Sequence, residues 1–227
     1  MTSTASNLTD LYKDKGHQYF TGARNDIIAL LPRTKPLNIL EVGCGDGSTG
    51  AAAIAQASVA RYDGVELDAG AAKLAEDKLT SVTLANAEHL DLATLGHRYD
   101  VLIMSEVLEH LVDPWLFLKR ATAILNDGAT IYASSPNVAS LKVVKSLLKG
   151  RFDYQPSGTM DRTHLRWFTP STYREMFESV GFTTIEARPL GALGPKGRIL
   201  DMLSGGRLRH LLHGQTMYIG RYSRPQA

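Results

Sequence analysis

The sequence has little of what would mark a secreted, membrane-spanning or strongly charged protein. It contains a single cysteine, Cys44, so no disulfide can form within the chain, and a reducing compartment is expected. No apolar run approaches the roughly 20 residues that cross a bilayer, and Met1–Asp10 lacks the charged and then apolar pattern of a signal peptide. The 25 basic and 23 acidic residues nearly cancel, so no overall field favours nucleic acid or an anionic membrane. We therefore expect a cytoplasmic protein without a transmembrane segment.

Strand and helix patterns alternate along most of the chain. Short apolar runs typical of buried strands are followed by alanine-rich or amphipathic stretches typical of helices. The predicted strands are 37–42, 61–66, 82–84, 99–104, 129–134, 183–187 and 216–221, with a turn expected at 126–128. Helices are expected at 7–31, 48–57, 69–79, 106–111, 114–125, 138–149 and 170–180. Repeated strand–helix units predict an α/β fold, a doubly wound parallel sheet with helices on both faces.

The length of the chain fits one α/β domain with modest additions, so we expect a single domain over 1–227. The alternating pattern changes after Pro136. We therefore assign 1–136 to a cofactor-binding half and 137–215 to acceptor-binding or lid elements.

Glycines follow the first predicted strand directly. Gly43, Gly45 and Gly47 let the backbone turn sharply and approach a ligand closely, and open α/β sheets bind ligands at such strand ends. No Gly-Lys-Ser/Thr follows, which excludes a Walker A loop, whereas Gly45, Gly47 and Gly50 meet the dinucleotide spacing G-x-G-x-x-G. Cys44 is interpreted as a small packing residue rather than a nucleophile. A ligand site and a tight structural turn both agree with this spacing.

Acidic and amide side chains near this turn narrow the choice of ligand. Glu41 and Asp46 flank the glycines and would repel a diphosphate, but they suit a ligand with an ammonium and a sulfonium. Glu66 ends the second predicted strand, where a carboxylate can accept hydrogen bonds from ribose hydroxyls. Asn86 follows the third strand, where its amide can meet an adenine edge. A solvent-exposed glutamate and a turn asparagine are the plain alternatives for these last two residues.

In these elements the chain resembles the class I S-adenosylmethionine-dependent methyltransferases, and among them the ubiquinone-biosynthesis O-methyltransferases and similar bacterial enzymes. The matching stretches are 41–47, 64–68, 99–111 and 134–137, within a resemblance that covers 7–182. It implies a Rossmann-like seven-stranded sheet, mostly parallel with an antiparallel C-terminal strand, and S-adenosyl-L-methionine as cofactor. The cofactor-binding residues that the resemblance implies are Glu41, Gly43, Cys44, Gly45, Gly47, Glu66, Leu67, Asn86, Ala87 and Ser105. Many relatives have Asp in place of Asn86, so the adenine contact departs from the family pattern.

A candidate catalytic cluster follows the fourth predicted strand. Glu106, Glu109 and His110 are spaced i, i+3, i+4, which places them on one face of the helix expected there, and His164 comes from the acceptor half. In one interpretation His110 or His164 acts as a general base or orients the acceptor. In a second, the four side chains bind a divalent metal, as in the similar motif of small-RNA 2′-O-methyltransferases. In a third they only pack or cap the helix. Of the two functional alternatives, we favour the histidines as catalytic residues without a metal.

Basic and aromatic side chains are interleaved in the acceptor half. The residues concerned are Lys142, Lys145, Lys149, Arg151, Phe152, Tyr154, Arg162, Arg166, Trp167 and Phe168. They suit a phosphorylated, acidic or sugar-containing acceptor, a single-stranded nucleic acid, or a solvated basic helix over an aromatic core. Residues 150–169 are expected to close over the substrates as a lid. Residues 198–213 suit a surface helix pair, a homodimer contact or a peripheral membrane contact.

The sequence therefore predicts an enzyme that O-methylates a small-molecule or saccharide-type acceptor; a nucleic acid partner is not favoured, and a homodimer is compatible with the pattern. Three alternatives stay open. They are a metal-assisted ribose or RNA 2′-O-methyltransferase, a non-catalytic nucleoside-binding protein, and a nicotinamide dehydrogenase, which the carboxylates beside the glycines disfavour.

Overall fold

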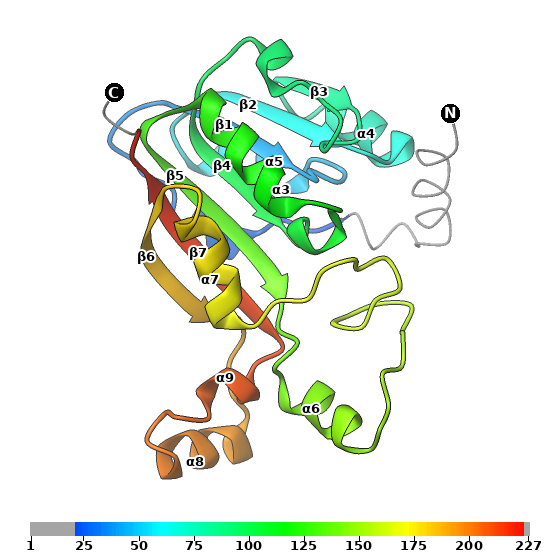
Figure 1. Cartoon of the computed structure of the whole chain (residues 1–227). Coiled ribbons are helices and arrows are strands. Elements are labelled where there is room, and N and C mark those ends of the chain that lie inside the picture. The colour runs from blue at the N-terminus through cyan, green and yellow to red at the C-terminus, as the bar shows by residue number, and fades with distance from the viewer. Residues whose placement is uncertain (1–20, 225–227) are drawn as a thin grey trace.

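Seven strands form one sheet in the computed structural model, which describes residues 21–224. They are β1 (Leu37–Val42), β2 (Val59–Glu66), β3 (Ser81–Leu84), β4 (Tyr99–Ser105), β5 (Leu125–Pro136), β6 (Phe182–Pro189) and β7 (Gln215–Tyr222). Their order across the sheet is β3-β2-β1-β4-β5-β7-β6 (Figure 1). The strands β1 to β5 pair in parallel, whereas β7 pairs antiparallel with both β5 and β6. The expected fold, including its antiparallel C-terminal strand, is confirmed.

Helices cover both faces of the sheet. They are α2 (Asn25–Ile28), α3 (Ser48–Gln56), α4 (Ala69–Glu76), α5 (Pro114–Ala121), α6 (Leu141–Leu148), α7 (Pro170–Glu178), α8 (Pro195–Leu203) and α9 (Arg209–Leu212). Short 3₁₀ turns are η2 (Leu92–Leu95), η3 (Leu108–His110) and η4 (Thr122–Ile124). Side chains that accept hydrogen bonds from backbone N–H groups mark where several helices begin. Asp68 caps α4, Asp113 caps α5, and Thr169 forms a capping box with Thr172 on α7.

The alternation of side chains along the central strands divides the core into two layers. Ile39 of β1 packs with Ile27 of α2 in the core on one face. Its neighbour Leu40 belongs to the core on the other face, together with Phe117 of α5 and Phe177 of α7. Because β1 and β4 are buried on both faces, their carboxyl ends have fixed positions.

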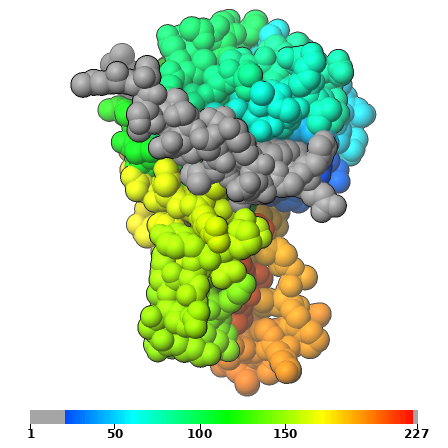
Figure 2. All heavy atoms as spheres, turned by 90° about the vertical axis from the view of Figure 1, so that its right-hand side faces the viewer, coloured from blue at the N-terminus to red at the C-terminus, as the bar shows by residue number. Residues whose placement is uncertain are grey.

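Two additions extend beyond the end at which the parallel strands finish. The helix α6 follows β5, and the pair α8 and α9 lies between β6 and β7 (Figure 1). Figure 2 shows the α6 segment and the α8–α9 segment below the sheet in the same direction. Within 21–224, no helix has both the length and the apolar character needed to cross a membrane.

The structure corrects two expectations close to the strand ends. The helix expected at 106–111 is wrong, because only the short turn η3 forms there and Glu106 has a positive φ of 56°. The turn expected at 126–128 is instead part of β5, where the pairing with β4 is irregular and Gly128 has φ 77°. At the first place a left-handed residue stands where a helix was expected, and at the second a left-handed glycine lies within a strand whose pairing is irregular.

Several helices are shorter than the sequence pattern indicates: α4 ends at Glu76 and α5 at Ala121, and two others start late. In place of the helix expected at 7–31, the structure has α2, which starts at Asn25; positions 7–20 lie outside the described residues. The helix expected at 138–149 is α6, which starts at Leu141. Asn137 accepts a hydrogen bond from the backbone N–H of Ala139, so a local turn precedes the helix.

Candidate functional site

A cavity of about 740 Å³ opens at the carboxyl ends of β1, β2 and β4. This is the end of a parallel sheet at which ligands bind. Most of the residues expected to bind the cofactor line it: Glu41, Gly43, Cys44, Gly45, Glu66, Leu67, Asn86, Ala87 and Ser105. Residues separated by more than sixty positions in the sequence are thus brought together at one site.

The glycine turn shapes one wall of the cavity. Gly43 has φ 72° and Gly45 has φ 53°, conformations that favour glycine. A Cβ at Gly43 would lie 2.6 Å from the Val107 side chain, so the turn has no room for a larger residue. Gly47 does not line the cavity: it caps α3 with φ 77°, and a Cβ there would lie 3.0 Å from the Ala75 backbone. Its role is to let α3 and α4 approach each other.

Cys44 packs against the second strand within this turn. It is buried, and a Cβ at Gly64 would lie 2.5 Å from its Sγ. Burial, together with the charge of Glu41, raises the pKa of the thiol. These surroundings disfavour a thiolate and agree with a packing role.

Glu66 is fixed by the backbone around it. Its carboxylate accepts hydrogen bonds from the N–H groups of Gly45, Leu67 and Asp68 at 2.8, 2.8 and 2.9 Å. Burial raises the pKa of this carboxyl, and the three N–H groups oppose that shift by stabilising the charged form. A carboxylate can accept about four hydrogen bonds. The group is therefore pre-oriented and keeps acceptor capacity for a ligand hydroxyl.

Glu41 is the second carboxyl group of the cavity. The Tyr62 hydroxyl donates to its Oε2 at 2.8 Å. Burial raises the pKa of Glu41 to about 8, although the hydrogen bond from Tyr62 and the charge of Arg24 act in the opposite direction. A cationic ligand group beside it would favour the charged form.

Asp46 does not belong to the cavity, contrary to its expected place beside the ligand. Its Oδ2 accepts from the Ser48 hydroxyl at 2.8 Å and from Lys78 Nζ at 3.0 Å. These hydrogen bonds lower the pKa of Asp46, although burial acts against them. The carboxyl groups that line the cavity near this turn are therefore those of Glu41 and Glu66.

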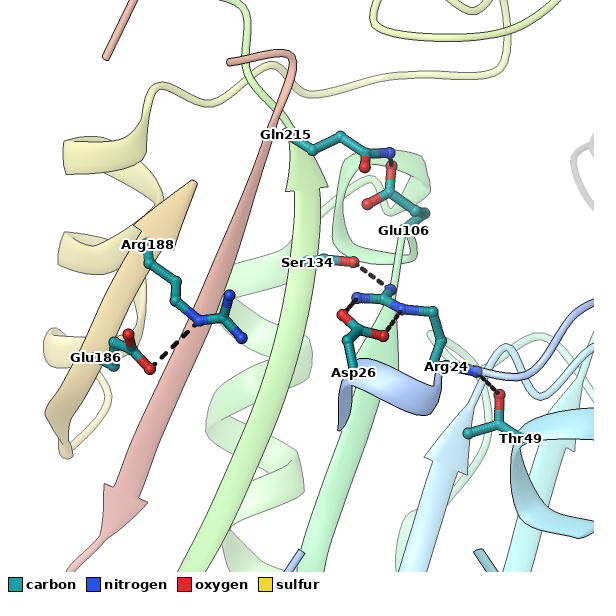
Figure 3. A network of polar contacts seen from close by, with 8 residues as sticks. All are labelled: Arg24, Asp26, Thr49, Glu106, Ser134, Glu186, Arg188 and Gln215. Atoms are coloured by element: carbon teal, nitrogen blue, oxygen red, sulfur yellow. Dashed lines mark hydrogen bonds and ion pairs between the residues drawn. The ribbon is translucent and has the colours of Figure 1, made fainter. Parts of the chain in front are cut away.

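Arg24 is a cavity residue that no sequence motif indicated. Figure 3 shows its guanidinium between Asp26 and Ser134. It donates to both Asp26 carboxylate oxygens at 2.9 Å and to the Ser134 hydroxyl at 2.9 Å, and its backbone N–H donates to Thr49. The contact with Ser134 spans 110 positions, so local pattern carries no signal for it. The network fixes the Arg24 guanidinium, paired with Asp26, in the lining of the cavity.

Two further side chains give the cavity polar groups for a nucleoside. The Ser105 hydroxyl is buried without a hydrogen-bond partner among the described residues. Such a group is costly unless a ligand or water satisfies it. Asn86 uses its Oδ1 to accept from the Glu88 N–H at 2.9 Å, which leaves its NH₂ group as the donor toward a purine edge. Asn86 is thus both a turn residue and a lining residue.

The two histidines meet across the cavity from these groups. The rings of His110 and His164 lie 4.7 Å apart in an edge-to-face arrangement. Each Nδ1 is 3.1 Å from a backbone carbonyl, of Thr163 and Thr159 respectively. Because a carbonyl oxygen only accepts, each Nδ1 carries the hydrogen, and the lone pair of the neutral ring lies on Nε2. In this tautomer Nε2 is the ring nitrogen that can take up a proton.

Glu109 lies beside the histidines in a fully enclosed position. Neither of its carboxylate oxygens has a hydrogen-bond partner among residues 21–224. Burial and the charge of Glu106 raise its pKa well above the ordinary range. Ligand atoms of Glu109, His110 and His164 lie within 4.8 Å of one another, a spacing that can hold one metal ion.

Glu106 does not join this cluster. Its positive φ turns the side chain toward β7, where Gln215 Nε2 donates to its Oε2 at 3.2 Å (Figure 3). The expected i, i+3, i+4 face is therefore wrong, since no α-helix forms there. The structure brings together three of the four residues considered for a metal.

The cavity as a whole suits a nucleoside that carries a cationic centre. Its lining combines carboxyl groups, the hydroxyl of Ser105 without a partner among the described residues, and the imidazoles of His110 and His164. A hydroxyl compound placed between them would have a base at hand. The residues present fit a ligand of the kind that the sequence resemblance implies.

Comparison with known proteins agrees with this geometry. A family model described as a methyltransferase domain matches residues 16–187. A ubiquinone biosynthesis O-methyltransferase of Cereibacter sphaeroides is 26% identical over 167 residues, which cover 72% of this chain and 66% of that protein. The chain thus spans slightly less than two thirds of the length of that curated relative.

Solved structures share the fold. An S-adenosylmethionine-dependent methyltransferase of Archaeoglobus fulgidus superposes with a TM-score of 0.65 at 18% identity, covering 90% of this chain and 97% of that one. The magnesium protoporphyrin IX methyltransferase of Synechocystis, solved with bound S-adenosylhomocysteine (SAH), gives a TM-score of 0.61 at 13% identity, with coverages of 97% and 95%. At these identities the likeness concerns the fold alone.

Proposed function

The chain belongs to the class I S-adenosylmethionine-dependent methyltransferase superfamily, and from this premise we propose that it methylates a hydroxyl group of a small-molecule or saccharide-type acceptor. The observation that carries the proposal is a single cavity in which Glu66 and Ser105 face a nucleoside site and two histidines line the acceptor side. The relative from Cereibacter is named as an O-methyltransferase, which supports oxygen as the methylated atom.

The cofactor supplies an electrophilic methyl group attached to a positively charged sulfur. Glu66 would accept hydrogen bonds from its ribose, and Asn86 would donate to its adenine. Glu41 would pair with the methionine ammonium, and Arg24 with the methionine carboxylate. Each role pairs a group with ligand atoms of opposite charge or complementary hydrogen bonding.

His110 and His164 are proposed to handle the proton of the acceptor. When the methyl group is transferred from sulfur to the acceptor oxygen, the hydroxyl would have to give up its proton. A histidine Nε2 would take up this proton, and the hydrogen bond of Nδ1 to a backbone carbonyl would orient the ring for it. A base in this position typically contributes about 10²- to 10⁴-fold to the rate.

Two measurements test this function. Calorimetry with SAH and with NAD identifies the ligand, and binding of NAD with no binding of SAH would end the proposal. Incubation with labelled S-adenosylmethionine and cell extract, followed by mass spectrometry, identifies the compound that gains a methyl. Turnover that survives both His110→Ala and His164→Ala would remove the histidines from the mechanism.

A second candidate function is metal-assisted methylation of a ribose or an RNA 2′-hydroxyl. It is favoured by the cluster of Glu109, His110 and His164, in which an enclosed carboxyl has no hydrogen-bond partner within the described residues. These three residues would hold the ion, which would supply a positive charge for the acceptor hydroxyls. Metal analysis and turnover in the presence of a chelator test it: full activity with no bound metal would exclude this function.

A further inference from the structure

A second cavity lies beside the first. It has a volume of about 460 Å³ and is lined by residues of α6 and of the segment that follows α6. Figure 2 shows these residues as the yellow-green mass in the lower part of the view. Ser157 and Thr159 line both cavities, so the two share a wall. The two cavities are therefore adjacent, with these two residues between them.

The residues between the two cavities belong to a turn that backbone hydrogen bonds stabilise. The Gln155 N–H donates to the Met160 carbonyl at 2.7 Å, and the Arg162 N–H donates to the Gln155 carbonyl at 3.0 Å. On the other side of the wall, the His164 ring donates to the Thr159 carbonyl at 3.1 Å. The second cavity is thus placed directly behind one of the two histidines that line the acceptor side.

Positive charge dominates the lining of the second cavity. It contains Lys142, Lys145, Lys149 and Arg151, but only one carboxylate, Asp153. Arg151 donates to Asp153 at 2.7 Å, so these two charges neutralise each other. Within 21–224, the three lysines enter no ion pair. Lys142 and Lys145 lie three positions apart on α6, and Lys149 directly follows the end of this helix.

We propose that this cavity binds a phosphate group carried by the acceptor, with Lys142, Lys145 and Lys149 as its partners. The inference rests on the proposed function and names the acceptor's chemical class. Three unneutralised ammonium groups match a doubly charged phosphate better than a single carboxylate, and lysine is a common phosphate partner. A solvated basic face would need no concavity and no wall in common with the reaction site.

The remaining lining of the second cavity suits the part of the acceptor next to the phosphate. Val143, Phe152 and Met160 give it apolar surface. The Phe152 ring packs edge-to-face against the Trp167 ring, with centroids 5.5 Å apart, and this contact helps to fix the position of Phe152. The phosphate would lie against α6 while the hydroxyl to be methylated reaches past Ser157 to the histidines.

The test compares two triple variants with the same change in charge. Lys142→Gln, Lys145→Gln and Lys149→Gln are combined in one protein. The matched control combines Lys73→Gln, Lys119→Gln and Lys196→Gln, which are exposed lysines outside both cavities. Each protein is saturated with SAH, and binding of inorganic pyrophosphate is measured by calorimetry at one low ionic strength.

We expect the wild type to bind pyrophosphate and the α6 variant to bind it about tenfold more weakly or worse, because charge-assisted contacts are lost. The control variant should stay within about twofold, since screened distant charges add little. Equal binding by both variants, or no binding by the wild type, would overturn the phosphate site and leave the proposed function intact. Failure of the wild type to bind SAH in the same experiment would overturn the proposed function instead.

A second arm separates an acceptor phosphate from a lipid phosphate. The proteins are sedimented with vesicles of phosphatidylcholine, with and without phosphatidylglycerol. Pyrophosphate binding without selective vesicle binding supports the acceptor site. Lysine-dependent binding to the anionic vesicles in the absence of pyrophosphate binding would assign the charges to a membrane surface and overturn the proposal.

Discussion

Glu41 is enclosed by protein although it lies where we place a cationic part of the cofactor. Tyr62, Arg24 and Glu66 face it, and burial raises its pKa to about 8. In the unfolded chain the same group ionises near its ordinary value of 4.5. The folded protein without ligand therefore retains a proton that the unfolded chain loses as the pH rises.

The stability of the ligand-free protein should consequently decline between about pH 4.5 and pH 8 through this group. We expect Glu41→Gln to remove that part of the decline, roughly 2 to 4 kcal/mol between the two ends of the range. Urea unfolding at pH 5.5 and pH 8.5 measures it, with the exposed Glu175→Gln as control. If the unfolding free energies of the wild type and of Glu41→Gln changed equally with pH, the raised pKa of Glu41 would be contradicted.

Glu66 gives a separate prediction on ligand affinity. An amide in place of the carboxylate presents an NH₂ group to backbone N–H donors, so Glu66→Gln should lose part of its support and one ribose contact. We expect SAH to bind about 10- to 100-fold more weakly, as for the loss of hydrogen bonds to a charged group. The exposed Glu76→Gln on α4 is the control, and calorimetry is the measurement. Unchanged affinity would show that Glu66 serves the fold alone.

At the scale of elements, the glycine after the cofactor turn controls how α3 packs on the sheet. A Cβ at Gly50 would lie 2.2 Å from Leu79 and 2.7 Å from the Tyr62 ring. Both neighbours are buried, so neither can move away freely. The spacing of Gly45, Gly47 and Gly50 thus reflects helix packing and does not require a dinucleotide.

Gly50→Ala should therefore destabilise the protein by roughly 1 to 3 kcal/mol, the usual cost of overpacking. Gly197→Ala on α8 is the matched control, since its Cβ would meet only the Leu193 side chain, at 3.2 Å or more. The control should be neutral or gain up to about 1 kcal/mol from helix propensity. Chemical denaturation compares the two, and equal effects would refute the packing explanation.

The elements that sequence patterns predicted well are those set by apolar runs. The bounds of β1 match the prediction because Leu37 to Val42 is buried at every position except Asn38 and is ended by glycine. The short turn η3 was missed because its form depends on the positive φ of Glu106, which a spacing argument does not register. Arg24 was missed because its role arises from a contact 110 positions away.

At the scale of the whole molecule, Tyr218 connects the last strand to the rest of the core. It is fully buried on β7, and its ring stacks on Phe177 of α7 with centroids 4.0 Å apart. The assignment of 1–227 to a single domain, with 1–136 as the cofactor half, remains a prediction. If the chain is one domain, a substitution that removes the Tyr218 ring should lower the stability of the cofactor half as well.

Tyr218→Ala is expected to cost roughly 3 to 5 kcal/mol of unfolding free energy, as for other buried aromatic residues. Tyr218→Phe keeps the stacked ring and should cost about 1 kcal/mol or less. Unfolding followed by circular dichroism and by tryptophan fluorescence should give coincident curves for each variant. Two separate transitions would show that the halves unfold independently and would refute the single-domain assignment.

The position of β7 between β5 and β6 has a consequence for how the protein is made. A ribosome releases β6 before β7, yet the only neighbour of β6 in the described sheet is β7. A nascent chain therefore carries an unpaired β6 and an unprotected edge on β5 until β7 emerges. During that interval the exposed strand edges can pair with other chains, which favours aggregation.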